Sequence, residues 1–568
     1  MKDTIFPTLT TPYFDAMDKD MPWNEYPRPQ MKRESFLCLN GHWDFAISES
    51  EDCRDFSEKI LVPFPVESLL SGIERDGVGK YLHYRRYIKL PDDFMGGRII
   101  LHFGAVDTIC DVYVNGNKVA HNEGGYLPFS ADITDFISDE VNELYVRVRD
   151  DLSVLYPYGK QTKKRGGMWY TPVSGIWQTV WAECVPSEYI EKIKITPTQN
   201  SVTIKVVGGS GSKKITLDDG KSYEFDSDEI TITPDTIKLW SPEEPNLYHF
   251  SLECGEDKIQ SYFALREIGI EQVNGIPRIT LNGKPYLFNG LLDQGYFPDG
   301  IFLPATSKGY EDDIRLAKEL GFNMLRKHIK IEPEIFYYLC DKMGMVVFQD
   351  MVNNSGYSFL LDTALPTIGF KRLNFDYRHA NKKSRAIFEE HMYGTMEHLY
   401  NFPSVLYYTV FNEGWGQFLA DKMYEKAKNF DSTRIIDATS GWFFKKKSDV
   451  DSRHVYFKPV KIGKTNGRPI VISEFGGYSH RVTGHLFGED NYGYSIFEKR
   501  EDFESAFHTL YRDEIKPLIS EGICALVYTQ ISDVEDETNG LITYDRRALK
   551  VDKEATSILM QSLCEEMK

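Results

Sequence analysis

The chain has 568 residues, 41% of them hydrophobic, and a formal net charge of −19. This length exceeds what one hydrophobic core usually serves, so two to four domains are expected. The acidic balance argues against nucleic acid and anionic membranes as partners. No run of 18 apolar residues is present, and residues 1–7 lack the layout of a secretory signal, which predicts a cytoplasmic protein.

Eight cysteines are scattered at wide spacing, without any Cys-x-x-Cys pair. This pattern predicts reduced thiols, several of them in cores, and no disulfide framework. It also offers no zinc or redox site, and we expect neither a metal nor a cofactor.

Residues 1–187 are predicted to form a two-sheet β-sandwich. Short strand-like runs, such as 98–103, 110–114 and 143–148, are separated by turn signals that include Asn115-Gly116. Residues 188–269 continue in the same style and fit one small immunoglobulin-like sandwich.

From residue 270 to 568 the pattern changes to strands that alternate with amphipathic helices. Eight such strands over about 300 residues favour a (β/α)₈ barrel over an open doubly wound sheet. The predicted strands are 286–293, 323–329, 345–351, 405–412, 435–439, 454–457, 469–474 and 524–530. The predicted helices are 310–320, 332–343, 385–400, 418–430, 504–520 and 551–566.

Two carboxylates follow strand-like runs in this barrel. They lie in the strings Phe411-Asn412-Glu413-Gly414 and Ser473-Glu474-Phe475-Gly476, at the ends of the fourth and seventh predicted strands. A barrel places its functional groups at the C-terminal ends of its strands, and strands four and seven face each other across the mouth. Glu413 and Glu474 are therefore predicted to confront one another.

Such a pair suits the cleavage of a glycosidic bond, which needs one protonated and one ionised carboxyl group. We assign Glu413 as the general acid/base and Glu474 as the nucleophile, supported by Arg326 and Tyr456. A single glutamate after a strand could instead cap the next helix, and Arg326 could be a structural ion-pair partner. Two facing carboxylates, one of them preceded by Asn412, favour the catalytic interpretation.

Several motifs resemble glycoside hydrolase family 2, which contains β-galactosidases, β-glucuronidases and β-mannosidases. The resemblance spans nearly the whole chain, and its three parts occur in the family's order. It rests on Asn40-Gly41-His42-Trp43, Tyr84-Arg85-Arg86, Tyr113-Val114-Asn115-Gly116, Gly175-Ile176-Trp177, Phe263-Ala264-Leu265-Arg266, Leu281-Asn282-Gly283-Lys284-Pro285, Gly321-Phe322-Asn323, Asn412-Glu413 and Ser473-Glu474-Phe475.

The resemblance implies a jelly-roll sugar-binding domain, an immunoglobulin-like domain and a TIM barrel. It implies a retaining mechanism in which Asn412 holds the sugar 2-hydroxyl. The predicted function is a β-galactosidase-like exo-β-glycosidase that removes a terminal neutral sugar; β-glucuronidase, β-mannosidase and arabinosidase are the alternatives. Uronic acid is disfavoured because the Asn-x-Lys string of family β-glucuronidases is missing from residues 536–541, and we expect the acidic segment 533–537 to be a solvated loop.

Further substrate contacts are sought among aromatic and acidic residues near the strand ends. Trp442 is the preferred platform for a sugar ring, and Tyr456 and Tyr528 are further candidates. Asp293 and Asp350 could bond sugar hydroxyls. Each could also be an ordinary core or structural residue.

Two rival functions of other classes remain. One is a catalytically silent carbohydrate-binding protein. The other is a metal-dependent hydrolase that uses Asp533, Glu535 and Glu537 with His454 or His480, although no ligand spacing supports it. The expected partner is a small carbohydrate, and a homo-oligomer is left open.

Overall fold

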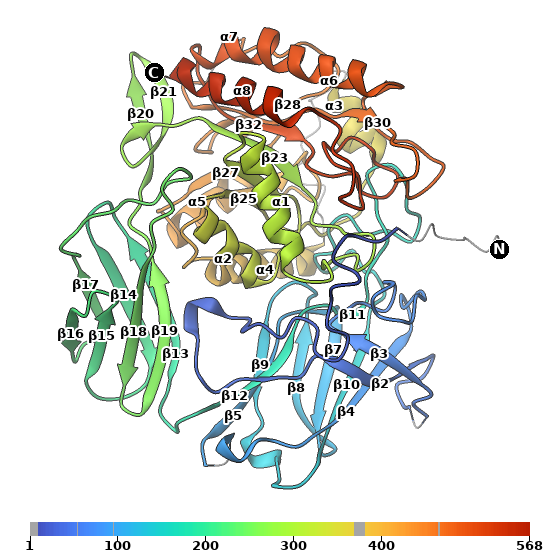
Figure 1. Ribbon diagram of the computed structural model, residues 1–568, viewed down its shortest axis with the longest axis vertical. Helices are drawn as coiled ribbons and strands as arrows, with labels where there is room; N and C mark the ends of the chain where they lie inside the picture. Colours follow the sequence, from blue (N-terminus) through green and yellow to red (C-terminus); the bar gives the residue numbers. More distant parts are fainter. Residues whose placement is uncertain (1–8, 54, 95, 368–380, 464–465, 568) are drawn as a thin grey trace.

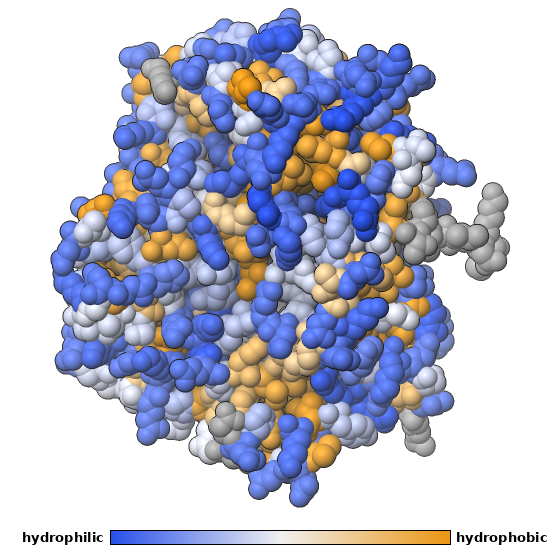
Figure 2. Space-filling view, viewed as in Figure 1, coloured by the Kyte–Doolittle hydropathy of each residue, from blue (hydrophilic) through white to orange (hydrophobic). Residues whose placement is uncertain are grey.

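Two β-sandwiches precede a barrel in the computed structural model, which describes residues 9–53, 55–94, 96–367, 381–463 and 466–567 (Figure 1). The first sandwich is blue to cyan, the second is green, and the barrel runs from yellow-green to red. Hydrophilic residues cover most of the face in Figure 2, with apolar patches between them. No helix among the described residues is both long and apolar enough to cross a membrane.

The first sandwich packs a four-stranded sheet against a six-stranded one, in the orders β1-β12-β5-β9 and β3-β2-β4-β10-β7-β8. Its strands alternate buried and partly exposed residues, as β10 does along its whole length, so one face of each sheet enters the core. The bounds are β1 Leu37–Cys38, β2 Gly41–Ser48, β3 Glu58–Val62, β4 Tyr81–Ile88, β5 Arg98–Phe103, β7 Ile109–Val114, β8 Asn117–Glu123, β9 Phe129–Asp132, β10 Asn142–Arg149 and β12 Val180–Val185. A short pair, β6 (Val106–Asp107) with β11 (Gly175–Ile176), accompanies them.

The second sandwich packs β13-β14-β17 against β16-β15-β18-β19 around its own apolar core. The bounds are β13 Ile190–Pro197, β14 Val202–Gly208, β15 Lys213–Leu217, β16 Ser222–Phe225, β17 Glu229–Ile232, β18 Tyr248–Cys254 and β19 Asp257–Phe263. A hairpin, β20 (Ile268–Val273) with β21 (Ile276–Leu281) and the short β22 (Lys284–Pro285), leads to the barrel. The predicted boundary at 187/188 falls between strands and the one at 269/270 falls inside β20; both boundaries stay predictions.

Eight parallel strands make the barrel, in the hydrogen-bonded order β27-β26-β25-β24-β23-β32-β29-β28. The bounds are β23 Phe288–Asp293, β24 Met324–Lys327, β25 Val346–Asp350, β26 Val405–Asn412, β27 Ile435–Ser440, β28 Asp451–Val455, β29 Ile470–Gly476 and β32 Ile523–Thr529. Side chains join the two ends of this order, since Ser440 of β27 lies 3.4 Å from Ser452 and 2.9 Å from His454 Nε2, both on β28. The predicted (β/α)₈ class is confirmed, with the sixth strand beginning three residues and ending two residues earlier than predicted.

Helices cover the outside of the barrel. Their bounds are α1 Lys308–Glu319, α2 Glu334–Met343, α3 Leu365–Thr367, α4 Lys382–His398, α5 Ala420–Phe430, α6 Arg500–Thr509, α7 Lys516–Ile519 and α8 Lys553–Cys564. The predicted helix 504–520 is interrupted, because a π-helical stretch, η6 (Leu510–Ile515), separates α6 from α7. Another, η4 (Phe359–Ala364), follows β25. Helix α2 ends at Gly344, whose φ of 73° favours glycine.

Strand alternation divides the barrel residues between two cores. Phe288, Met324 and Val527 belong to an inner cluster, whereas Leu291 and Leu325 pack with the surrounding helices. The inner cluster fills the barrel, so polar groups are gathered at the C-terminal ends of the strands.

A loop of the first sandwich, residues 151–174, reaches the barrel mouth. Tyr170 donates a hydrogen bond to Glu537, and the backbone N–H of Thr171 donates to Glu535 at 2.8 Å. The prediction of a solvated acidic segment at 533–537 is therefore wrong. Glu535 and Glu537 are both 3% exposed, because their carboxylates accept hydrogen bonds from this loop, which covers them.

A substitution at Gly290 tests how closely strands β23 and β24 pack. A Cβ atom at this position of β23 would lie 2.3 Å from the backbone oxygen of Met324, so Gly290→Ala forces two neighbouring strands apart. We expect a loss of about 1–3 kcal/mol, seen as a lower unfolding midpoint at a fixed scan rate. Gly356→Ala is the matched control, since nothing lies within 4 Å of its Cβ position. Equal midpoints for the two variants would contradict this packing.

Candidate active site

Glu413 and Glu474 meet at the barrel mouth. Glu413 is the first residue after β26 and has a φ of 53°, a left-handed conformation that is uncommon outside glycine, while Glu474 lies on β29. His454 stands between them, with Nδ1 2.8 Å from Glu413 Oε1 and 3.4 Å from Glu474 Oε2. One oxygen of each carboxylate and this nitrogen all lie within 4.8 Å of one another.

Arg326 joins three of the neighbouring groups. Its guanidinium donates to Asp350 Oδ1 at 3.0 Å, to Glu474 Oε1 at 3.1 Å and to Asn412 Oδ1 at 2.9 Å. Burial alone would raise the pKa of Glu474, but His454 and Arg326 beside it bring that pKa below its usual value. The arrangement keeps Glu474 ionised.

Tyr456 contacts the other side of Glu474. Its hydroxyl donates to Glu474 Oε2, and its ring stacks on Tyr494 with centroids 3.8 Å apart. Burial first, and then the charge of Glu474, raise the pKa of Tyr456 well above its usual value, so the phenol stays a hydrogen-bond donor. Glu474 thus accepts hydrogen bonds from a cation and a phenol.

Sequence reasoning did not assign His328 and His454 to this site. His328 Nδ1 lies 2.7 Å from Asp350 Oδ2, and burial lowers the pKa of His328. Alternation along a strand could have found both, because residues two apart point to the same face: His328 follows Arg326, and His454 precedes Tyr456.

Asp293 and Tyr528 lie outside this cluster. Asp293 Oδ2 accepts from Lys327 Nζ at 2.6 Å, in a buried network behind the strands. Tyr528 packs between Phe475 and Phe507 among the outer helices. Along their strands, both residues alternate with those that face the inside of the barrel, so their side chains point toward the outer helices. We therefore leave them out of the proposed site.

Trp442 and Asp350 lie close to the carboxylates. Trp442 is 8% exposed, its ring centroid is 5.5 Å from that of His454, and its Nε1 donates to the backbone oxygen of Asp362. The carboxylate of Asp350 already contacts Arg326 and His328. We therefore expect it to position these two side chains rather than to bind a sugar hydroxyl.

Lys160 brings a positive charge from the first sandwich to this region. Its Nζ lies 6.0 Å from the Trp169 ring centroid, and its charge acts on both His328 and Glu537. Within the described part of the chain, no carboxylate forms an ion pair with it. Besides the effect of burial, its charge acts to lower the pKa of both His328 and Glu537, which places it beside the residues of the barrel mouth.

In the described residues, the acidic segment and the histidines named for the rival metal-dependent hydrolase are bound to other partners. Asp533 is bound by Lys550 Nζ at 2.6 Å, and His480 Nδ1 faces the backbone oxygen of Phe497. Among the residues described, the group able to offer three ligand atoms is instead Glu413, His454 and Glu474.

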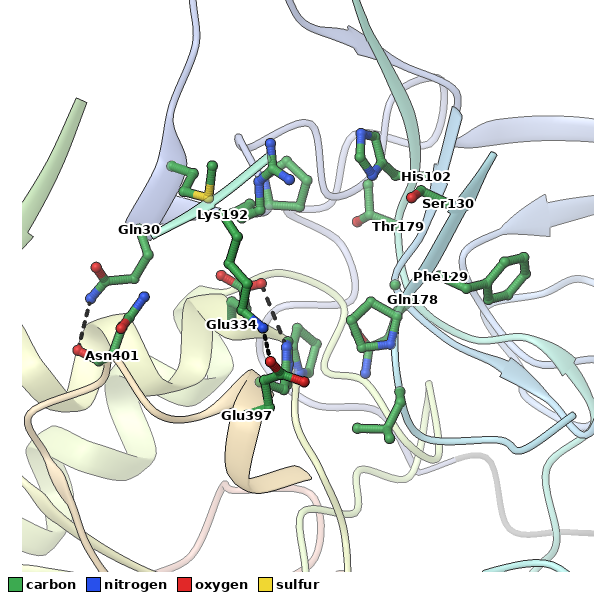
Figure 3. A pocket seen from close by; sticks show the side chains of 18 of the residues that line it. Gln30, His102, Phe129, Ser130, Gln178, Thr179, Lys192, Glu334, Glu397 and Asn401 are labelled. Carbon is green, nitrogen blue, oxygen red and sulfur yellow. Dashed lines mark hydrogen bonds and ion pairs between the residues drawn. The ribbon is translucent and has the colours of Figure 1, made fainter. Parts of the chain in front are cut away.

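A separate cavity of about 450 Å³ lies between the two sandwiches and helices α2 and α4 (Figure 3). His102 and Gln178 line it from the first sandwich, Lys192 from the second, and Glu334 and Glu397 from the helices. Glu413 and Glu474 do not line it, so it is not the cavity of the carboxylate pair.

Three family models match successive parts of the chain. They are "Glycosyl hydrolase 2 galactose-binding domain-like" over residues 78–174, "Glycosyl hydrolases family 2" over 189–266 and "Glycosyl hydrolases family 2, TIM barrel domain" over 273–548. The matches follow the order of the two sandwiches and the barrel.

Among curated relatives, a β-galactosidase of Thermoanaerobacter pseudethanolicus is 27% identical over 296 residues, which are 47% of this chain and 39% of the relative. A β-galactosidase of Leuconostoc mesenteroides is 25% identical over 87% of this chain and 49% of the relative. The chain therefore spans less than half the length of these relatives.

Solved structures share the fold. A β-D-glucuronidase of Dictyoglomus thermophilum superposes with a TM-score of 0.74 at 18% identity, covering 95% of this chain and 98% of that one. A β-galacturonidase of Eisenbergiella tayi, bound to galacturonate, gives a TM-score of 0.70 at 20% identity over 94% and 98% of the two chains. With the three family models matched in order along most of its length, the chain belongs to glycoside hydrolase family 2.

Proposed function

We propose that the protein is a retaining exo-β-glycosidase. The observation that carries this is that Glu413 and Glu474 face each other across His454, with one oxygen of each carboxylate within 4.8 Å of the other, which favours the shorter of the two known arrangements. Retaining enzymes hold their carboxyl groups about 5–5.5 Å apart, whereas inverting ones need about 6.5–9.5 Å to admit a water. The exo mode of action follows the predicted removal of a terminal sugar, and Glu474 is 5% exposed at the barrel mouth.

The reaction takes two displacements. Glu474 attacks the anomeric carbon while Glu413 gives its proton to the departing oxygen, which leaves a glycosyl ester on Glu474. Glu413, now ionised, removes a proton from water, and the hydroxide attacks the same carbon and releases Glu474. The proton that Glu413 donates first is thus recovered in the second step.

The surrounding groups favour these roles. Arg326 and Tyr456 stabilise Glu474 as an anion before attack and as a leaving group afterwards. The amide oxygen of Asn412 is occupied by Arg326, so its N–H groups are left to donate to the sugar 2-hydroxyl. His454 links the two carboxylates through one nitrogen, Nδ1, and so holds them toward each other.

The first candidate substrate is a neutral β-galactoside. The two curated relatives described above are named β-galactosidases, which favours this candidate, as does the missing Asn-x-Lys string. The second candidate is a β-uronoside, and the observation that favours it is Lys160, a cation whose charge acts on His328 and Glu537. A panel of galactoside, glucuronide, galacturonide, mannoside, glucoside and arabinoside substrates separates the two.

Changing Glu474 to Ala should abolish turnover, because no group remains to form the glycosyl ester. The measurement is hydrolysis of a chromogenic β-glycoside, with mass spectrometry of the protein after a 2-fluoro-glycoside. The wild type should gain one sugar mass and the variant none. Labelling of the variant at the wild-type rate would refute the nucleophile assignment, and full wild-type activity in chelator would exclude the metal-dependent alternative.

Changing Glu413 to Ala should spare substrates with acidic leaving groups in the first step, since these depart without a proton. Added azide should then accelerate the second step and yield a β-glycosyl azide, because azide needs no general base. We expect losses on the order of 100-fold or more for poor leaving groups. Equal losses for all leaving groups, with no effect of azide, would count against this role.

The Arg326→Met variant tests the ionisation of Glu474. Without the guanidinium the pKa of Glu474 rises, so the acid limb of the profile of kcat/KM against pH moves to higher pH. We expect a rate loss on the order of 100-fold. Arg453→Met is the control, because Arg453 pairs with Asp451, and both residues lie on β28. An unmoved acid limb in Arg326→Met would show that Arg326 does not control this carboxylate.

Lys160→Met tests the second candidate. If a uronate carboxylate binds the ammonium group, kcat/KM for that uronoside falls by at least about tenfold, while neutral galactosides stay within about threefold. Lys163→Met, in the same loop, is the matched charge control. A wild-type protein without measurable uronosidase activity would remove the second candidate.

A further inference from the structure

The loops around the barrel mouth expose several large apolar side chains. We define the apolar rim as the six exposed residues that follow β25, β26, β27, β28 and β29. Its members are Phe359, Leu360, Leu419, Phe444, Phe457 and Ile496, with exposed fractions of 62%, 60%, 39%, 42%, 62% and 60%. Thirteen large hydrophobic side chains in the described part of the chain are this exposed, so nearly half belong to one rim.

Short chains of contacts connect the rim to the carboxylates. On one side, the Phe457 ring lies 5.1 Å from that of Tyr494, which stacks on Tyr456, and Tyr456 bonds to Glu474. The rim therefore begins three contacts away from the proposed nucleophile.

A second chain of contacts runs to Glu413. Phe359 and Leu360 lie on η4, whose Asp362 backbone oxygen accepts from Trp442 Nε1 at 3.0 Å. The Trp442 ring packs on His454, which bonds to Glu413. Both carboxylates are thus connected to the same rim.

A third group of aromatic residues stands next to the acid/base. Trp415, two residues after Glu413, packs edge-on against Trp169 and Tyr357 at centroid distances of 5.1 and 5.9 Å. Trp169 comes from the loop of the first sandwich. The departing group of a glycoside must pass on the Glu413 side, because Glu413 donates the proton to it.

We propose that the aglycone subsite is apolar, and that the preferred substrates are glycosides of an aromatic or long alkyl group rather than oligosaccharides. This inference rests on the proposed exo-glycosidase function. Exposed apolar patches of this kind mark binding sites in soluble proteins. A second sugar would instead require hydrogen-bonding groups on the loops where the rim presents phenyl and alkyl side chains. The rim residues follow five of the strands whose C-terminal ends carry the site, so an apolar aglycone that extends from a seated sugar is expected to contact them.

Alkyl glycosides test the proposal without changing the acidity of the leaving group. Methyl, butyl and octyl glycosides of one sugar are compared by kcat/KM, together with a disaccharide of that sugar. Each buried methylene is worth up to about fourfold, so octyl should exceed methyl by at least about tenfold. The wild type should also prefer the octyl glycoside to the disaccharide.

A matched pair of variants locates the effect. Ile496→Ser on the rim and Ile558→Ser on α8 remove the same side chain at exposures of 60% and 63%. Ile496→Ser and Phe457→Ser should lower the octyl-to-methyl ratio by at least about threefold, while Ile558→Ser leaves it unchanged. Titrating the Glu474→Gln protein with octyl and methyl glycosides should show the same order of affinity without turnover.

Three outcomes would overturn the inference. One is an octyl-to-methyl ratio near one in the wild type, and another is an equal response of the rim and control variants. The third is a dimer in sedimentation that Ile496→Ser dissociates without changing the ratio, which would make the rim an interface between copies of the chain. Failure to cleave any glycoside would instead refute the proposed function, so the two failures are distinguishable.

Discussion

The buried guanidinium of Arg326 is the interaction around which the site is organised. It lies on the second strand of the barrel and binds Asp350 of the third, Asn412 of the fourth and Glu474 of the seventh. A charge that is 1% exposed must be balanced by its neighbours, so the strands that carry these groups are held in register. The same contacts that balance the arginine bring the pKa of Glu474 below its usual value. Stability of the barrel mouth and ionisation of the proposed nucleophile therefore have one physical cause.

The first sandwich contributes to the site through a loop rather than through a sheet. Tyr170 and Thr171 are bound by Glu537 and Glu535, and this places Lys160 and Trp169 over the mouth. Burial raises the pKa of Glu535 to about 7 and also raises that of Glu537, so these carboxyl groups accept protons more readily than exposed ones. The mouth is thus formed by segments of two domains.

Two kinds of surface meet at this entrance. Inside, charged and polar groups are paired with one another around the carboxylates, and outside, the loops present apolar side chains to solvent. A glycoside has the same division when its aglycone is apolar, because the sugar offers hydroxyls and the departing group offers hydrocarbon. The 450 Å³ cavity between the domains has a different setting, lined by both sandwiches and two helices, and takes no part in this arrangement.

Local pattern determined much of this protein. Apolar alternation and turn residues predicted all eight barrel strands, and the positions of Glu413 and Glu474 after two of them predicted that the carboxylates would meet. Residues two apart along a strand face the same side, and this rule would have added His328 and His454 to the predicted site. The same rule would have placed Asp293 and Tyr528 on the outer face of the barrel. The burial of Glu535 and Glu537, and the arrival of Lys160 from another domain, depend on contacts between segments more than 350 residues apart. Only the tertiary structure decided these two features. The local pattern of a sequence indicates which side chains are apolar enough to be buried, but it does not identify the distant residues that contact them.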